Sequence, residues 1–172
     1  LVTSFAGAGN EFGRLTGIGI NNALNRMYVS DATAQRVLAI DMLAPSAVTT
    51  LAGSGTAGNT DGTGTAASFR FGNQAVENFG TSETGQGLTL NADGNIYVGE
   101  HYTTASFHTQ IRKITPAGVV TTVAGSRLEP MSMETIAQPA GLTAVSGTDL
   151  YYVCGSSGFF QGISRVNAGV KS

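Results

Sequence analysis

Short apolar stretches that alternate with polar residues recur along the whole chain, and residues that favour turns separate them. The clearest pair, Leu88–Leu90 and Ile96–Val98, flanks Asn91-Ala-Asp-Gly-Asn95, a sequence typical of a tight turn between two strands. No window longer than a few residues has the period of an amphipathic helix, although Glu129–Ala137 has room for one helical turn. The pattern therefore predicts an all-β chain.

One apolar phrase is repeated. Val48-Thr-Thr-Leu-Ala-Gly-Ser54 and Val120-Thr-Thr-Val-Ala-Gly-Ser126 are nearly identical, and Val2-Thr-Ser-Phe-Ala-Gly7 is a looser copy. A phrase that recurs at such intervals indicates a repeat protein, and four-stranded repeats are typical of propeller blades. The expected strands are 2–6, 15–20, 26–31, 35–41, 48–54, 86–91, 95–100, 110–115, 120–126, 140–145, 150–154 and 162–167.

The wording of the repeats resembles the NHL-repeat family of β-propellers. The resemblance rests on VTTLAGSGTAGNTDGTGTAASF (48–69), GLTLNADGNIYVGE (87–100) and QIRKITPAGVVTTVAG (110–125), and it covers almost the whole chain. It implies an all-β propeller segment of about three four-stranded blades, as part of a six-bladed ring. It implies little about function, because this fold carries many unrelated roles.

The whole chain, 1–172, is therefore expected to form a single segment with repeat units of about 1–47, 48–119 and 120–172. We label the strands of each blade a to d from the axis outward, so that the repeated phrase is strand d. The b–c and d–a connections then share one face, here called the top face. Two long connections of the middle blade lie there, an insertion at about 54–85 and a b–c loop at Glu100–Thr109. Long loops within a compact domain often carry function.

The phase of the repeats leaves the expected ring open. The chain begins with strand d, Val2–Ala6, and stops where another strand d is expected to begin. A closed propeller needs at least four blades. Two explanations remain: further repeats of the same polypeptide, or a head-to-tail homodimer in which Val2–Ala6 completes the third blade of a partner.

Composition excludes some classes of partner. The net charge of −2 and the pI near 5.6 give no basic footprint for nucleic acid or anionic lipid. No apolar run approaches the roughly 20 residues of a membrane-spanning helix. The single Cys154 has no partner for an internal disulfide, and the low charged fraction of 12% favours an extracellular, cell-surface or periplasmic location.

Few residues suggest metal chemistry. His101 and His108, with Glu100 and Tyr102 beside them, are a weak candidate for a Zn²⁺ site, but they lack the rigid spacing of helical ligands. Asp61 lies in a turn with alternating oxygen side chains, which resembles a Ca²⁺ loop but lacks its final glutamate. The simpler interpretation is that His101 and His108 are solvated loop residues and that the Asp61 turn is structural. No metal, cofactor or catalytic residue is therefore predicted.

A ring of acidic residues would favour a metal-dependent lyase or hydrolase. Asp31 and Glu100 end strand b in the first two units, but Gly155 is aligned with them in the third, and the ring is broken. We expect Asp31 to accept hydrogen bonds from backbone groups at the strand end. A tyrosine recurs three residues earlier in strand b and predicts packing between blades, at Tyr28, Tyr97 and Tyr152. In this alignment Cys154 matches Ser30 and Gly99.

These patterns favour a non-enzymatic protein–protein interaction scaffold that uses the loop-rich top face. Phe69 is expected to pack under the insertion, whereas other residues are candidates for contact with a partner: Phe71, Phe79, His101, Tyr102 and His108. A metal-dependent lyase or hydrolase of the propeller type is one alternative. A structural subunit of a fibre or appendage is the other.

Overall fold

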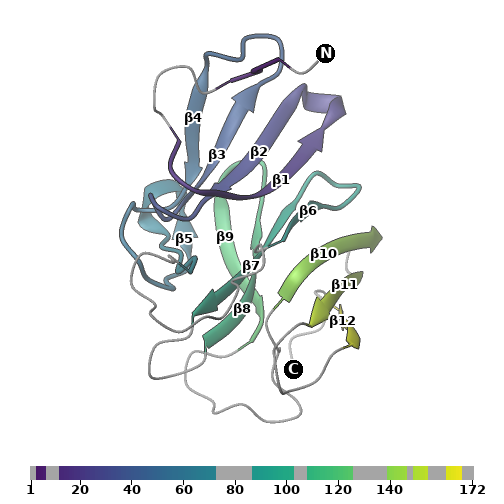
Figure 1. Ribbon diagram of the computed structural model, residues 1–172. Coiled ribbons are helices and arrows are strands. Elements are labelled where there is room, and N and C mark those ends of the chain that lie inside the picture. The colour runs from purple at the N-terminus through teal and green to yellow at the C-terminus, as the bar shows by residue number, and fades with distance from the viewer. Residues whose placement is uncertain are drawn as a thin grey trace.

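The chain forms three antiparallel sheets arranged like the ribs of a fan, in a computed structural model (Figure 1). The structure describes residues 3–6, 12–72, 87–102, 108–125, 139–146, 149–154 and 162–167. Each sheet is one blade, offset from the repeat units because the outer strand that opens one unit belongs to the sheet of the blade before it, and we number the blades 1, 2 and 3 in chain order. Blade 1 lies at one end of the fan and blade 3 at the other, with blade 2 between them.

Blade 1 has four strands in the order of the sequence: β1 (Leu15–Asn21), β2 (Arg26–Asp31), β3 (Arg36–Asp41) and β4 (Val48–Ala52). The β1–β2 turn is a 3₁₀ helix, Asn22–Leu24. It begins at Asn21, whose side chain accepts a hydrogen bond from the Leu24 N–H, and it ends at the left-handed Asn25. Asparagine side chains and backbone thus cap this turn at both of its ends.

Blade 2 has the same four strands and a fifth at its outer edge. The repeat strands are β6 (Leu88–Leu90), β7 (Ile96–Tyr102), β8 (His108–Ile114) and β9 (Val119–Ala124). The fifth, β5 (Gly62–Thr63), comes from the insertion and pairs with the start of β9. Blade 3 has three strands in its described part: β10 (Pro139–Ser146), β11 (Asp149–Cys154) and β12 (Gly162–Asn167).

The expected strands are confirmed from residue 15 onward, with ends that agree within two residues. Two expectations were wrong. Thr3–Ala6 pairs with no described strand, because an outer strand needs a strand c beside it and none lies there. Half of the expected loop Glu100–Thr109 is strand, because β7 and β8 continue to the pair Tyr102 and His108, with 103–107 between them.

The core lies between neighbouring blades. Tyr28 of blade 1 belongs to one buried cluster with Ile96 and Val98 of blade 2. Tyr97 of blade 2 belongs to the next cluster with Leu150 of blade 3. The large apolar side chains of strand b thus join the blades face to face, which confirms the packing role expected for Tyr28 and Tyr97.

The alignment of blade 3 needs correction by one residue. Tyr97 lies opposite Thr89 in blade 2, and the matching partner of Thr143 in blade 3 is Tyr151. Tyr152 therefore takes the place of Val98 and packs toward blade 2. The register follows from the glycine of strand a, since Gly141 pairs with Val153 in blade 3 as Gly17 pairs with Ser30 in blade 1. The repeated Tyr-Val sequence of strand b, which guided the alignment, does not set it. By the same register, Cys154 rather than Gly155 matches Asp31 and Glu100, whereas Ser30 and Gly99 are matched by Val153.

Candidate functional site

The insertion between β4 and β6 is the main departure from the repeat. Its described part, residues 53–72, follows the outer edge of blade 2 as β5 and the short 3₁₀ helix Gly64–Ala66, and then turns inward. Gly64 lies beside the β8–β9 turn, where its N–H donates to the Gly118 carbonyl. The insertion therefore forms the outer edge of blade 2 and does not only connect β4 to β6 on the top face. The candidate binding surface expected on the top face thus continues along this outer edge.

Two phenylalanines anchor the insertion in the core between blades 1 and 2. Phe69 and Phe71 are fully buried, and their rings stack with centroids 5.1 Å apart and an interplanar angle of 12°. The packing expected for Phe69 is confirmed. Phe71 was expected among the contact residues, but only 1% of it is exposed, so it is withdrawn from them. The alternation Phe-Arg-Phe places both rings on the buried side of an extended segment.

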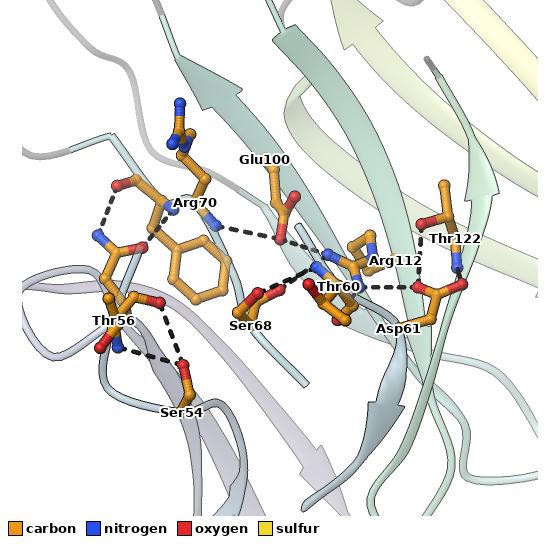
Figure 2. A network of polar contacts seen from close by, with 11 residues as sticks. Ser54, Thr56, Thr60, Asp61, Ser68, Arg70, Glu100, Arg112 and Thr122 are labelled. Atoms are coloured by element: carbon orange, nitrogen blue, oxygen red, sulfur yellow. Dashed lines mark hydrogen bonds and ion pairs between the residues drawn. The ribbon is translucent and has the colours of Figure 1, made fainter. Parts of the chain in front are cut away.

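A buried arginine holds the insertion from blade 2. The Arg112 guanidinium, on β8, donates to the Glu100 carboxylate at 3.1 Å and to the Asp61 carboxylate at 2.8 Å. It also donates to the Thr60 and Ser68 carbonyls at 3.0 and 3.1 Å, and its cationic carbon lies 5.4 Å from the Phe69 ring centroid. Figure 2 shows Arg112 between Glu100 and Asp61. One side chain therefore fixes the insertion at two separate points, Thr60–Asp61 and Ser68.

The two acidic members of this network were weak metal candidates in the sequence. Asp61 accepts from the Thr122 N–H and hydroxyl, both at 3.0 Å, as well as from Arg112 (Figure 2). Glu100 accepts from the Arg70 N–H at 3.4 Å and from Arg112. The two carboxylates converge on a guanidinium, which supplies the positive charge that a metal ion would otherwise provide.

Gln35 holds the same segment from blade 1. Its amide makes two hydrogen bonds of 2.8 Å with the backbone of Phe71, one to the carbonyl and one from the N–H. The amide also donates to the Ala32 carbonyl at 2.7 Å. The insertion is thus clamped between Gln35 on one blade and Arg112 on the next. Neither residue was singled out from the sequence.

Blade 1 repeats this arrangement in a simpler form. Asp31 accepts from the N–H of Gly13 at 3.2 Å and of Ala34 at 3.1 Å, and it pairs with Arg36 at 3.5 Å. The expected role of Asp31 at a strand end is confirmed. Glu100 does the same for Arg70, so the acidic residue at this position of strand b holds the connection that enters its blade.

The remaining candidates can be placed only by backbone or not at all. His101 lies opposite Thr109, and Tyr102 lies opposite His108, at the end of the β7–β8 hairpin. Phe79 lies outside the described residues. In the part of the chain that the structure describes, no three His, Cys, Asp or Glu side chains gather as a metal site. No described helix is long and apolar enough to cross a membrane.

The buried carboxyl predicts a pH dependence of stability. Burial raises the pKa of Glu100 from 4.5 to about 7, against the opposing effect of Arg112. Because the folded state holds this proton more tightly than the unfolded chain, the stabilisation is complete below pH 4.5 and is lost as the pH rises through 7. Glu100→Gln, which does not ionise, is expected to remove about 3 kcal/mol of pH-dependent stability.

Urea unfolding of both proteins between about pH 5 and about pH 8 measures this difference. The wild type should lose stability over that range more steeply than Glu100→Gln. Equal slopes would contradict the prediction and would mean that the carboxyl stays ionised throughout.

Comparison with known proteins identifies the fold. No protein-family model and no curated protein matches the sequence. A protein of unknown function from Bacteroides thetaiotaomicron is similar in structure, with a TM-score of 0.56, 16% identity, and coverage of 90% of this chain and 37% of that one. A luciferin-regenerating enzyme has a TM-score of 0.50, 18% identity, and coverage of 91% and 45%.

The chain spans less than half the length of these two proteins. Identities this low carry information about fold and none about activity. The fan of antiparallel sheets, the cores between them and the two structural matches agree: the chain is a β-propeller segment of about three blades.

Proposed function

We propose that the chain is a non-enzymatic scaffold of the NHL type, and that the insertion of blade 2 binds a protein partner. The observation that carries the proposal is the clamp formed by Gln35 and Arg112, which fixes an irregular segment before any partner is present. A surface that is already ordered loses little conformational entropy on binding. A mere spacer between two blades would not need two buried polar anchors.

The chemistry of the exposed side suggests what kind of partner fits. With the phenylalanines buried, the insertion exposes mainly small hydroxyl side chains: Ser54, Thr56, Thr60, Thr63 and Thr65. Ser54 is itself ordered, since its hydroxyl donates to the Thr56 carbonyl at 3.2 Å. We call these five residues the insertion surface. It suits a protein partner that offers hydrogen-bonding groups rather than a strongly charged or apolar one.

The acidic residues of this region favour a scaffold over a metal-dependent lyase or hydrolase. Asp31, Asp61 and Glu100 each accept hydrogen bonds from a guanidinium and from backbone N–H groups, and these bonds hold the connections between blades. Their carboxylates support structure in the described part of the chain. Elemental analysis of the purified protein discriminates, because stoichiometric Zn²⁺ or Ca²⁺ would favour the enzyme.

Charge placed on the insertion surface is expected to weaken partner binding. Thr56→Arg and Thr65→Arg each put a bulky cation on an exposed position without touching the buried clamp. We expect both to reduce capture of the partner at least tenfold, which corresponds to about 1.4 kcal/mol. Capture from an extract of the native source, quantified by mass spectrometry, measures the loss.

The matched control is Ala92→Arg, which adds the same cation to the exposed β6–β7 turn on the same blade. It should capture the same proteins as the wild type. If Thr56→Arg and Thr65→Arg also retain every protein that Ala92→Arg retains, the insertion surface is not the binding site.

A further inference from the structure

The outer repeat strand of blade 2, β9, binds a carboxylate at one threonine. The Thr122 N–H donates to one oxygen of Asp61 and the Thr122 hydroxyl donates to the other, both at 3.0 Å. Arg112 adds a third hydrogen bond at 2.8 Å (Figure 2). The two residues that follow the acid, Gly62 and Thr63, pair with β9 as the short strand β5. One threonine of an outer strand therefore holds an acidic residue at the start of an added strand.

Blade 1 presents the same threonine groups on β4, the outermost strand of its sheet in the described part of the chain. Thr122 of β9 lies opposite Arg112, beside a bulge. Thr50 of β4 lies opposite Leu38, beside a bulge at the same place. The common phase of pairing directs the Thr50 N–H away from the sheet, as it directs the Thr122 N–H. The side chain of Thr50 is exposed as well, so both of its donors face outward.

A cation lies beside Thr50, although it comes from another position of strand c. A guanidinium nitrogen of Arg36 is 3.5 Å from the Thr50 hydroxyl oxygen. Arg36 precedes Leu38 by two residues, which places the two side chains on the same face of β3. The buried Asp31 carboxylate, 3.5 Å from the same guanidinium, holds it there. Blade 1 therefore combines an N–H, a hydroxyl and a cation at one point of its outer edge.

The accessibility of this point does not depend on whether another blade precedes blade 1. Asp61 occupies the equivalent point of blade 2, and its side chain is 49% exposed although blade 1 packs against blade 2. The connection that enters blade 1, residues 7–14, is much shorter than the insertion and has no counterpart of Asp61-Gly-Thr63. Its one acidic residue, Glu11, lies outside the described residues.

We propose that Thr50 and Arg36 form a binding site for an acidic residue in an extended segment of a partner protein. The carboxylate takes the N–H and the hydroxyl of Thr50 and lies beside the charge of Arg36, as the equivalent groups of blade 2 bind Asp61. The residues after the acid add to the outer edge of β4 as β5 adds to β9. The partner segment therefore resembles Asp61-Gly-Thr63, with one acid followed by small residues.

A capped peptide with the sequence of residues 59–66, Asn-Thr-Asp-Gly-Thr-Gly-Thr-Ala, is the probe. Titrated into the isotope-labelled 172-residue chain, it should shift the amide resonance of Thr50 in a saturable way. The amide resonance of Thr122 should not move, because the chain's own Asp61 occupies that threonine. A peptide with Asn in place of Asp should bind about tenfold more weakly, because a carboxamide has a single acceptor oxygen and no charge.

Thr50→Val tests the site from the side of the chain. It removes one of the hydrogen bonds to the carboxylate and should weaken peptide binding about tenfold. Thr49→Val is the matched control, since it removes the adjacent hydroxyl of β4, which donates to the Ala39 carbonyl at 3.3 Å. Successive residues of a strand point to opposite faces, so this variant should bind the peptide like the wild type.

Glu11→Gln separates a site for a partner from a site that the chain fills itself. The peptide should bind this variant and the wild type alike. Binding that appears only in Glu11→Gln, equal affinity for the Asp and Asn peptides, or no loss in Thr50→Val would each overturn the proposal. No partner of the insertion surface takes part in these measurements, so this inference and the proposed function can fail independently.

Discussion

Replacing Arg112 with alanine is expected to lower the free energy of unfolding by about 3–5 kcal/mol, the usual cost of breaking a buried ion pair on one side. Arg112 is fully buried and bonded to two carboxylates and two carbonyls. Its loss leaves Glu100, whose side chain is 4% exposed, without a cation and frees the Asp61 turn. Urea unfolding at neutral pH measures the change.

Arg165→Ala is the control. Arg165 also pairs with an aspartate at 2.8 Å, Asp149, but its side chain is 56% exposed, so water replaces the partner and no measurable change is expected. Arg112→Lys should fall between the two, because a lysine keeps the charge but cannot reach four acceptors at once. A loss for Arg112→Ala as small as that for Arg165→Ala would mean that the insertion is held in another way.

Phe69→Ala is expected to cost about 3–5 kcal/mol as well, because it empties a fully buried aromatic site. Phe69 stacks on Phe71 and lies beneath the Arg112 guanidinium, so its removal also loosens the polar network above it. Phe5→Ala is the matched control, since Phe5 is about half exposed and should change stability little.

The same unfolding measurements on the double variant Phe69→Ala/Arg112→Ala test whether the two residues act together. Residues in contact do not add independently, so the combined loss should be smaller than the sum of the single losses. Strict additivity would contradict the view that ring and guanidinium hold one segment.

The strands of all three blades could be predicted from the sequence because each is short, apolar at alternate positions and bounded by turn residues. The outermost strand of blade 2, β5, could not be predicted in this way. Gly62–Thr63 has no strand pattern of its own and pairs only because the insertion brings it beside β9. The register of β11 was missed for a related reason: a repeated Tyr-Val pair outweighed the spacing that fixes the pairing.

The candidate site was predicted in part. Asp61 and Glu100 were noticed, but Arg112 was not, because an arginine beside a lysine in a strand normally faces water and the partners Thr60, Asp61 and Ser68 lie far away in the sequence. One signal was present. Register aligns Arg112 with Leu38 of blade 1, so a cation lies where blade 1 has a buried leucine. A charged residue at a position where an equivalent blade buries an apolar residue indicates a buried charge, and it also indicates a nearby segment that supplies hydrogen-bond partners for that charge.

The clamp also has a consequence for cooperativity. Repeat proteins usually unfold by nearest-neighbour coupling, with each unit held only by the adjacent one. Gln35 and Arg112 belong to different blades but grip one segment, so blades 1 and 2 cannot part without losing the same set of buried hydrogen bonds. We therefore expect these two blades to unfold as a single foldon, and we expect the described chain to open first at the boundary between blades 2 and 3.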